Sequence, residues 1–397
     1  MRTCAILLLA WATPALAQVV IVNRSSYVRA ASNAESQDCY HANAGDTLVL
    51  DTPDRENGYY KVTAPDNCHG YVYAGRVSIR LNGERPAWAS GGAAQPTGPV
   101  ATGVPRLLNA CSFNMRFIGS GDHKQYQAMA DMLAVYDLVI VQELVAPPET
   151  LTFAGITIAS SMGSETFFTV MHSKGFAHAL SEGKTGDNNN TTRGNTSEYF
   201  VVFYKPNVLT YVPARSGFID APLVANNVFS RVPWKFHFRT VDGTLDFTAI
   251  DVHLKPDQGN ASARKAELAF VAAHANADGE RDQLIVGDMN FYTCAEMEAA
   301  LPSGYSSLNA ACLITNIAAV EKHPYDHVMY REQYTGNDMV NGSFEVLPLQ
   351  TLMKAKWDPD DGVYPTVPPK SSAFYGGYFS DHNPVAWRMR YGVHDDD

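Results

Sequence analysis

Seven hydrophobic runs along this chain each carry, at one end, a carboxylate, amide or imidazole side chain. The strings are SFNMR with Asn114, LVIVQEL with Glu143, TSEYFVVFYKP with Glu198, IDVHLK with His253, LIVGDMN with Asp288 and Asn290, YDHVMY with Asp326, and SDHNPV with Asp381 and His382. Runs of this length and composition are typical of buried strands. A single such residue at a strand end is ordinarily a turn or cap residue. The whole set constrains the fold more strongly, because it predicts one cleft along the edge of a sheet.

The carboxylates and amides of this set favour a site for a hard metal ion. Oxygen ligands such as Glu143, Asp288 and Asp381 suit Mg²⁺, and also Mn²⁺ or Ca²⁺. Asn114 and Asn290 orient ligands or donate to phosphate oxygens without adding negative charge. A bound cation neutralises a phosphate group and stabilises the leaving oxygen during hydrolysis. We therefore expect a metal-dependent site for phosphoester chemistry.

Two histidines of the set are suited to proton transfer. His253 and His382 each lie in a specific local string, and imidazole exchanges protons near neutral pH. A carboxylate beside each ring fixes its tautomer and favours its charged form. Glu198 and Asp326 are the candidates for these partners.

Size and charge set limits on the class of protein. A chain of 397 residues has room for two or three domains, and 46% hydrophobic residues allow a sizeable core. The formal net charge is -11, whereas a protein that binds nucleic acid mainly through a basic surface carries the opposite balance. Clustered carboxylates that bind a metal ion are nevertheless compatible with a phosphate substrate.

The first residues have the pattern of a secretory signal peptide. Arg2 precedes a short apolar stretch, residues 5–11, and Ala15-Leu16-Ala17 is a small-residue cleavage pattern before Gln18. We expect residues 1–17 to be removed and the mature chain to be secreted or periplasmic. The alternative is an uncleaved anchor. No later segment is apolar over the length that a transmembrane helix needs.

The cysteines agree with export to an oxidising compartment. Cys39 and Cys68 lie in one small region, and Cys294 and Cys312 in another, so each pair is suited to a local disulfide. Cys111 lies in an apolar run and is expected to be a buried thiol. The sequence contains no CxxC spacing, which argues against a structural zinc site.

Composition changes divide the chain into segments. Residues 18–82 contain many short strand-like pieces punctuated by Gly, Asn, Asp and Pro, which predicts a small all-β barrel. Residues 83–105 are rich in Gly, Ala and Pro and are predicted to be a linker. From residue 106 to residue 397, strands alternate with helices, which predicts a two-sheet core with outer helices.

Helical periodicity predicts two amphipathic helices in this last segment, over residues 124–136 and 261–277. The faces expected to be buried are Met129, Ala130, Leu133 and Tyr136 in the first helix, and Ala266, Phe270 and Ala273 in the second. Residues 183–196 are polar and are predicted to form a mobile loop, and residues 330–379 are predicted to form long loops over the rim of the cleft.

The N-terminal pieces VRAAS, AGDTLVLD, YYKV and CHGYVYAGRVS resemble the bacterial Src-homology-3-like (SH3-like) domain. In that family the barrel tethers or targets a catalytic partner, which implies a cell-wall or peptide ligand. The residues Tyr59, Tyr60, Tyr71 and Tyr73 either form an aromatic binding groove or pack a small barrel.

The seven strings, in this order, resemble the endonuclease/exonuclease/phosphatase superfamily, whose type member is pancreatic deoxyribonuclease I. The resemblance extends over residues 106–391 and implies an α+β fold, a four-layer α/β/β/α sandwich with the site at one edge of its two sheets. It also implies roles. Glu198 with His253 forms the general acid pair and Asp326 with His382 the general base pair, although which histidine takes which part stays open. The implied metal ligands are Glu143, Asn114, Asp288 and Asp381, and Asp288 and Asn290 contact the phosphate or a second metal ion.

Two further strings resemble the deoxyribonuclease branch, namely TSEYFVVFYKP and the FSRVP string around Arg231. By this resemblance Arg231 clamps a phosphate, and Arg193 and Arg116 contact the DNA backbone. An ordinary arginine at a sheet edge is the alternative for Arg231. Thr196 stands where that branch has a groove-inserting tyrosine, which weakens the expectation of strict cleavage in a duplex minor groove.

Three hypotheses about function follow. The first is an exported Mg²⁺-dependent nuclease that cleaves DNA, or RNA, with low sequence specificity and leaves 5′-phosphate ends. The second is a phosphodiesterase or phosphatase of the same superfamily that acts on a phospholipid or an inositol phosphate; residues 373–379 (AFYGGYF) are the candidate membrane loop. The third is a binding protein that works through its barrel, and the complete set of catalytic residue types argues against it. The oligomeric state stays open.

Overall fold

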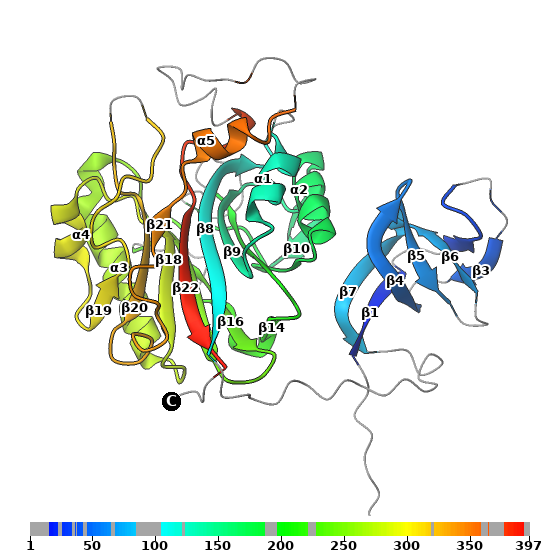
Figure 1. Cartoon of the computed structure of the whole chain (residues 1–397), viewed down its shortest axis with the longest axis horizontal. Helices are drawn as coiled ribbons and strands as arrows, with labels where there is room; N and C mark the ends of the chain where they lie inside the picture. Colours follow the sequence, from blue (N-terminus) through cyan, green and yellow to red (C-terminus); the bar gives the residue numbers. More distant parts are fainter. Residues whose placement is uncertain are drawn as a thin grey trace, which may run out of the picture. The chain divides into compact units, whose positions relative to one another are not determined.

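The structure is a computed structural model, and it describes residues 16–22, 26–33, 36, 38–42, 46–64, 68–84, 105–120, 124–186, 197–220, 228–318, 321–358, 364 and 377–392. The chain divides into two compact units, Met1–Thr97 and Gly98–Asp397 (Figure 1).

The first unit is all-β, as the sequence predicts. Its strands are β1 (Leu16–Val22), β2 (Ser26–Arg29), β3 (Asp38–Ala42), β4 (Thr47–Glu56), β5 (Tyr59–Thr63), β6 (His69–Tyr73) and β7 (Val77–Glu84). They pair antiparallel in the order β3-β2-β6-β5-β4-β1-β7. Alternation along β5 and β6 places Tyr60, Val62 and Val72 in the core.

The same alternation separates the tyrosines of this unit. Tyr60 is 5% exposed and packs in the core, whereas Tyr59, Tyr71 and Tyr73 lie on the outer face. Tyr73 packs edge-on against Tyr59, with ring centroids 5.4 Å apart. Tyr60 therefore cannot belong to a binding groove, while the three outer tyrosines keep that prediction open. The predicted disulfide partners, Cys39 and Cys68, are bonded.

Two sheets and a short ribbon make up the strands described in the second unit. The first sheet has the order β12 (Ala177–Leu180), β13 (Tyr199–Tyr204), β9 (Leu138–Leu144), β8 (Arg106–Ile118), β22 (Val385–Tyr391), β21 (Glu345–Val346). The second has the order β14 (Leu209–Tyr211), β16 (Trp234–Thr240), β17 (Asp246–His253), β18 (Gln283–Asp288), β20 (Asp326–Arg331), β19 (Tyr305–Ser307), with β15 (Gly217–Phe218) beside β16. The ribbon pairs β10 (Leu151–Phe153) with β11 (Ile156–Ile158).

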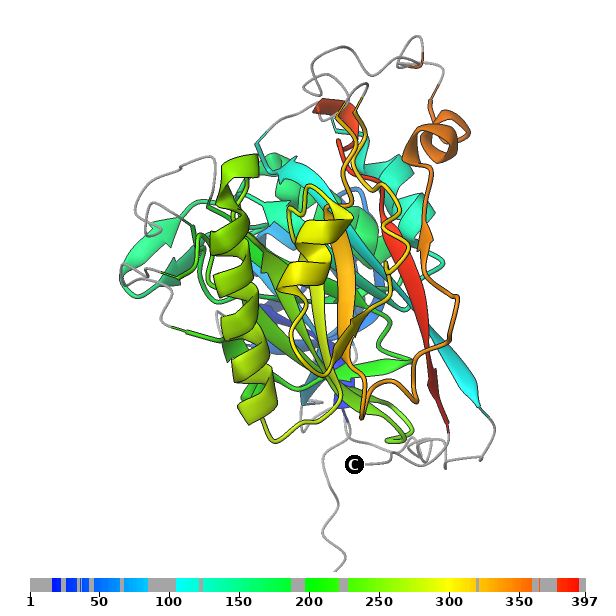
Figure 2. The same ribbon diagram turned by 90° about the vertical axis from the view of Figure 1, so that its left-hand side faces the viewer.

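Helices cover the outer face of each sheet, which gives four layers (Figures 1 and 2). Helices α1 (Tyr126–Leu133), α2 (Met162–Ser173) and α5 (Leu349–Lys354) share a hydrophobic cluster with the first sheet. Helices α3 (Ala261–Ala277) and α4 (Cys294–Ala300) do the same with the second sheet, and Figure 2 shows both in front of its strands. The predicted α+β class and four-layer sandwich are confirmed.

Helix α1 buries the predicted face, but helix α3 does not. In α3 the residues expected to be buried are exposed: Ala266, Phe270 and Ala273. The buried face instead consists of two charged residues, Arg264 and Glu267, and four apolar ones, Leu268, Val271, Ala272 and Ala275. Glu267 accepts the backbone N–H groups of Ser230 and Lys255, and Arg264 donates to the carbonyl oxygens of Lys255 and Asp257. The buried apolar residues keep a helical spacing, so the periodicity was present but the wrong face was chosen; hydrogen bonds to loop backbone satisfy the buried charges.

Some predicted boundaries differ from the structure. Strand β1 begins at Leu16, inside the predicted signal peptide, and pairs with β7, which extends to Glu84, inside the predicted linker. Residues 85–104 and 1–15 lie outside the described residues. Residues 183–186 are buried, and Thr185 pairs with Glu198, so this part is not the mobile loop that was expected; residues 187–196 lie outside the described part.

The remaining predictions at this level concern cysteines and membrane segments. Cys294 and Cys312 are bonded, with Cα atoms 5.7 Å apart, and Cys111 is a buried free thiol, as expected. Among the described residues, none of the helices has the length and apolar character that a membrane crossing requires.

Candidate active site

The topology of the two sheets brings the polar strand ends to one edge. Strands β8 and β9 are parallel, and so are β17 and β18, so in each pair the carboxyl ends lie together. Strands β22, β13 and β20 run antiparallel to β8, β9 and β18, so their amino ends lie at the same edge. The carboxyl ends supply Asn114, Glu143, His253 and Asp288, and the amino ends supply Glu198, Asp326, Asp381 and His382. The strand directions thus bring the polar residues of the seven strings to one edge of the two sheets.

The carboxylate of Asp288, 2% exposed, lies at the centre of this site. Its Oδ2 accepts a hydrogen bond from Nδ2 of Asn114 at 2.9 Å. The same oxygen lies 3.5 Å from Nε2 of His253 and 3.6 Å from Nε2 of His382. Both imidazoles therefore turn their Nε2 atoms toward one point.

His253 is paired with Glu198, as the sequence predicts. Its Nδ1 lies 3.1 and 3.0 Å from the two carboxylate oxygens of Glu198. Glu198 also accepts the backbone N–H of Glu143 at 3.1 Å and lies 3.8 Å from Nε of Arg231. Burial and Arg231 lower the pKa of His253, but the carboxylates of Glu198 and Asp288 outweigh them and raise it above the ordinary value.

His382 is paired with Asp326 in the same manner, with Nδ1 at 2.8 Å from Oδ2. Burial lowers the pKa of His382, but the charges of Asp326 and Asp288 outweigh it and hold the pKa well above the ordinary value. Two hydroxyl groups hold the backbone of the two paired residues in place. The Oγ of Ser380 accepts the N–H of His382, and Oγ1 of Thr315 accepts the N–H of Asp326, each at 3.0 Å.

Glu143 has a backbone conformation that residues other than glycine rarely adopt, with φ at 66°. Strain of this kind is concentrated at functional sites. Its Oε2 accepts the N–H of Phe117 at 3.1 Å, and its Oε1 accepts Nδ2 of Asn114 at 3.0 Å. Burial raises the pKa of Glu143, and the nearby charges of Asp381 and Glu198 add to that rise.

The amide of Asn114 joins two candidate metal ligands. Its Oδ1 accepts the backbone N–H of Arg116 at 3.0 Å, which turns its nitrogen toward Glu143 and Asp288. Asn114 therefore holds these carboxylates together rather than presenting its own oxygen.

The donor set fits a hard divalent cation. One ligand atom from each of Asp288, Asp326 and His382 lies within 4.8 Å of the others. Oδ1 of Asp326 is buried and has no hydrogen-bond partner among the described residues. Carboxylate oxygens packed this closely repel one another, and a cation such as Mg²⁺ relieves that repulsion. Asp326 thus joins Glu143 and Asp288 as a candidate ligand, which the sequence did not indicate.

The predicted substrate arginines have different positions. Arg116 forms an ion pair with the predicted metal ligand Asp381, NH1 to Oδ2 at 2.5 Å. Arg231 is 5% exposed, lies beside Glu198 and donates to the carbonyl oxygen of His253 at 3.4 Å. Arg193, like Thr196, lies outside the described residues.

Asn290 lies directly beyond β18 with φ at 52°. Its backbone N–H donates to Oδ1 of Asp288 at 2.9 Å, and its Nδ2 donates to the carbonyl oxygen of Leu254 at 3.0 Å. Asn290 thus orients the central carboxylate and leaves the Oδ2 of Asp288 to the imidazoles.

Sequence reasoning missed a buried pair beneath the site. Gln142 donates through Nε2 to Oδ1 of Asp251 at 2.7 Å, and neither side chain is exposed to solvent. Gln142 precedes Glu143, and Asp251 precedes His253 by two residues on the same face of β17. The alternation of the strand was the available signal, because it places a charged residue facing the other sheet.

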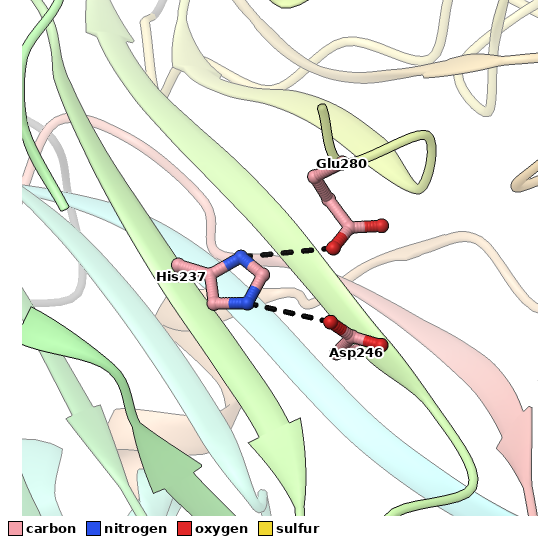
Figure 3. Close-up of side chains that lie close together, drawn as sticks. All are labelled: His237, Asp246 and Glu280. Atoms are coloured by element: carbon pink, nitrogen blue, oxygen red, sulfur yellow. Dashed lines mark ion pairs between the residues drawn. The ribbon is translucent and has the colours of Figure 1, made fainter. Parts of the chain in front are cut away.

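A second group of ligand-type side chains lies at the other end of β17. His237, Asp246 and Glu280 face one another, with His237 Nε2 at 3.5 Å from Asp246 and Nδ1 at 3.9 Å from Glu280 (Figure 3). NH1 of Arg215 lies 3.1 to 3.4 Å from all three side chains. The guanidinium already supplies a cation here, so we interpret this group as a hydrogen-bonded ion network.

One family model and several solved structures match this chain. A family model described as the endonuclease/exonuclease/phosphatase family matches residues 111–382, more than half of the chain. Among solved structures, the chain is similar to a protein of that description from Bacteroides thetaiotaomicron, at 15% identity and a TM-score of 0.46, covering 72% of this chain and 99% of that one.

Two further solved structures are similar at comparable levels. One is a humanized D. rerio TDP2 with 14 mutations, at 14% identity and a TM-score of 0.48, covering 71% of this chain and 98% of that one. The other is the human Nocturnin catalytic domain with bound sulfate anion, at 13% identity and a TM-score of 0.46, covering 74% and 96%. A search of the curated proteins finds no match.

Proposed function

The chain belongs to the endonuclease/exonuclease/phosphatase family of phosphoester hydrolases, and from that premise we propose that it is a metal-dependent nuclease. It hydrolyses phosphodiester bonds of DNA, and also of RNA, with low sequence specificity. The observation that carries the proposal is the convergence of two carboxylate-paired imidazoles on one oxygen of Asp288. Such a pair supplies one proton donor and one proton acceptor on either side of a phosphorus atom.

The two histidines divide the proton transfers. Glu198 and Asp326 hold the Nδ1 atoms, so each Nε2 is presented to the substrate. We assign Nε2 of His253 as the donor to the leaving oxygen and Nε2 of His382 as the acceptor of a proton from the attacking water. The pKa values of both rings are raised, so they do not separate donor from acceptor, and this division follows the family resemblance of the two strings.

The carboxylates would hold the metal ion. The proposed ligands are Glu143, Asp288, Asp326 and Asp381, with Asn114 joining the first two. Bound Mg²⁺, Mn²⁺ or Ca²⁺ neutralises the phosphate charge. Asn290 contributes by orienting Asp288.

Arginines are proposed to contact the phosphate groups of the substrate. Arg116 is half-buried beside Asp381 and is the best placed of the described candidates. Arg193 remains a proposal from the sequence. The burial of Arg231 favours a role in positioning Glu198 over a direct phosphate clamp.

We propose export and targeting for the rest of the chain. The two disulfides are compatible with a secreted or periplasmic protein. The first unit is proposed to be an SH3-like targeting barrel whose outer tyrosines, Tyr59, Tyr71 and Tyr73, contact a cell-wall or peptide ligand.

Digestion of plasmid and single-stranded DNA tests the nuclease proposal. Cleavage is expected with Mg²⁺ or Mn²⁺ and is expected to stop in EDTA. His253→Ala and His382→Ala are each expected to lower kcat by about 10² to 10⁴. His274→Ala, on helix α3, is the matched control and is expected to keep activity.

The opposite result has a clear meaning. Folded wild-type protein that cleaves neither DNA nor RNA with any of the three metals would rule the nuclease out. Phospholipid and inositol phosphate substrates are then the next assay, since the same catalytic groups serve them.

A further inference from the structure

Three aromatic side chains outside the catalytic set gather beside His382. Tyr292 lies 4.6 Å from His323 and 5.3 Å from Tyr325 between ring centroids, and His323 lies 5.1 Å from Tyr325. The ring of Tyr325 lies 5.7 Å from the imidazole of His382. We call Tyr292, His323 and Tyr325 the aromatic shelf.

The aromatic shelf connects the reaction centre with solvent. Tyr292, His323 and Tyr325 are each partly exposed, with Nε2 of His323 buried, whereas His382 is 7% exposed. Burial raises the pKa of Tyr325, and a hydrogen bond with Tyr292 and the charge of Asp288 raise it further. The ring of Tyr325 lies against His382, whose Nε2 is 3.6 Å from the central carboxylate of Asp288. A group carried by the substrate beside the reacting phosphate would therefore lie against this shelf.

The fold holds the aromatic shelf in place. The guanidinium carbon of Arg264, a fully buried residue, lies 5.3 Å from the ring centroid of Tyr292. Nδ1 of His323 lies 2.9 Å from the carbonyl oxygen of Tyr292. The disulfide between Cys294 and Cys312 fastens the segment that follows Tyr292 to a second part of the chain. Rings ordered before binding lose little entropy when a ligand stacks on them.

Electrostatic attraction contributes little affinity for a nucleic acid here, so another source of affinity is needed. The net charge is -11, so long-range attraction of a polyanion is weak. The arginines nearest the reaction centre are already paired, Arg116 with Asp381 and Arg231 with Glu198. Base stacking on aromatic rings supplies affinity that depends on neither net charge nor base identity.

We propose that the aromatic shelf is a stacking subsite for a nucleobase next to the scissile phosphate. Both faces of a base are covered by its neighbours within a duplex, so this subsite selects unpaired strands. The proposal rests on the nuclease function and adds its substrate class: single-stranded or locally unpaired nucleic acid.

Single-stranded oligonucleotides with one cleavable linkage test the proposal. One version carries bases on both sides of that linkage, and the other carries abasic sugars there. Wild-type protein is expected to cleave the first with a kcat/KM about tenfold higher, the size of one stacked base. Tyr292→Leu and His323→Leu are expected to abolish this difference while leaving cleavage of the abasic version unchanged. Tyr334→Leu, an aromatic residue stacked on Arg331 away from the site, is the control and is expected to keep the tenfold difference.

Each other outcome overturns a defined claim. Equal cleavage of both oligonucleotides by wild-type protein overturns the stacking subsite and leaves the nuclease intact. An equal loss on both substrates in the variants also overturns it, because that result reveals only a structural role. Wild-type protein that digests plasmid DNA but cleaves neither oligonucleotide overturns the subsite alone, whereas failure on plasmid DNA, RNA and both oligonucleotides overturns the nuclease as well.

Discussion

At the residue scale, Asp251 and His253 share one face of β17, and the pKa of each is raised for a different reason. His253 has carboxylate neighbours that raise its pKa and favour the protonated ring. Asp251 has no cation beside it among the described contacts; burial raises its pKa well above the ordinary value, and the charge of Glu198 adds to this. The raised pKa favours the neutral carboxyl, and Oδ1 of Asp251 accepts a hydrogen bond from Nε2 of Gln142.

Asp251→Asn tests this charge state. When the pKa of a carboxyl is higher in the folded state than in the unfolded state, its contribution to stability is fully present below the unfolded pKa of about 3.9. That contribution is lost as the pH rises. Wild-type protein carries that loss and the amide variant does not. We expect the variant to gain stability relative to wild type between pH 4 and pH 8, measured by denaturant unfolding in EDTA. Equal differences at both pH values would show that Asp251 is ionised.

At the element scale, the pairing of β16 with β17 places His237 beside two carboxylates, yet the pKa of its ring is lowered. His237 in β16 is 2% exposed and faces Thr248 of β17. Burial, and after it Arg215, lowers the pKa of His237 to about 4 despite the neighbouring carboxylates. The network in Figure 3 thus contains one permanent cation and one neutral ring.

His237→Gln tests the acid sensitivity of this network. A depressed folded-state pKa gives stability that is present above the unfolded value of about 6.5 and is lost as pH falls toward 4. The loss is about 3 kcal/mol for this histidine. The variant is expected to lose correspondingly less unfolding free energy between pH 6.5 and pH 4. Parallel stability curves for the two proteins would contradict the assignment.

The disulfide at the start of α4 is expected to stabilise the second unit. Cys294 and Cys312 close a loop with a sequence separation of 18 residues. Cys294→Ser with Cys312→Ser is expected to cost about 3 kcal/mol of stability in the second unit. Cys39→Ser with Cys68→Ser is the matched control, and it is expected to affect only the unfolding of the first unit. Calorimetry of both variants separates the two transitions.

At the scale of the whole molecule, the candidate site and the proposed targeting barrel belong to separate units of the chain. Every candidate catalytic and metal-binding residue that the structure describes comes from the second unit. The first unit has its own core of valines and leucines, so neither unit needs the other to bury its apolar side chains.

A truncated chain that begins at Gly98 tests this separation. It is expected to fold and to cleave a short single-stranded oligonucleotide with the kcat/KM of the full chain, because the site residues are all retained. Binding to cell-wall material or to peptide ligands is expected to be lost. A large fall in kcat/KM for the folded truncated protein would show that the first unit contributes to the site.

The sequence by itself determined what local patterns encode. Alternation and strand-end residues predicted the candidate site residues and the division into an all-β and an α+β unit, because these depend on neighbours a few residues away. The positions of the cysteines predicted the disulfide partners Cys294 and Cys312. Only the tertiary structure decided what depends on strand direction and packing. It brought His253 and His382 to one oxygen of Asp288. It buried Arg264 and Glu267 of α3 together with the apolar face of that helix. It also joined Tyr292 to Tyr325, from separate segments, beside the catalytic ring, which no local periodicity records.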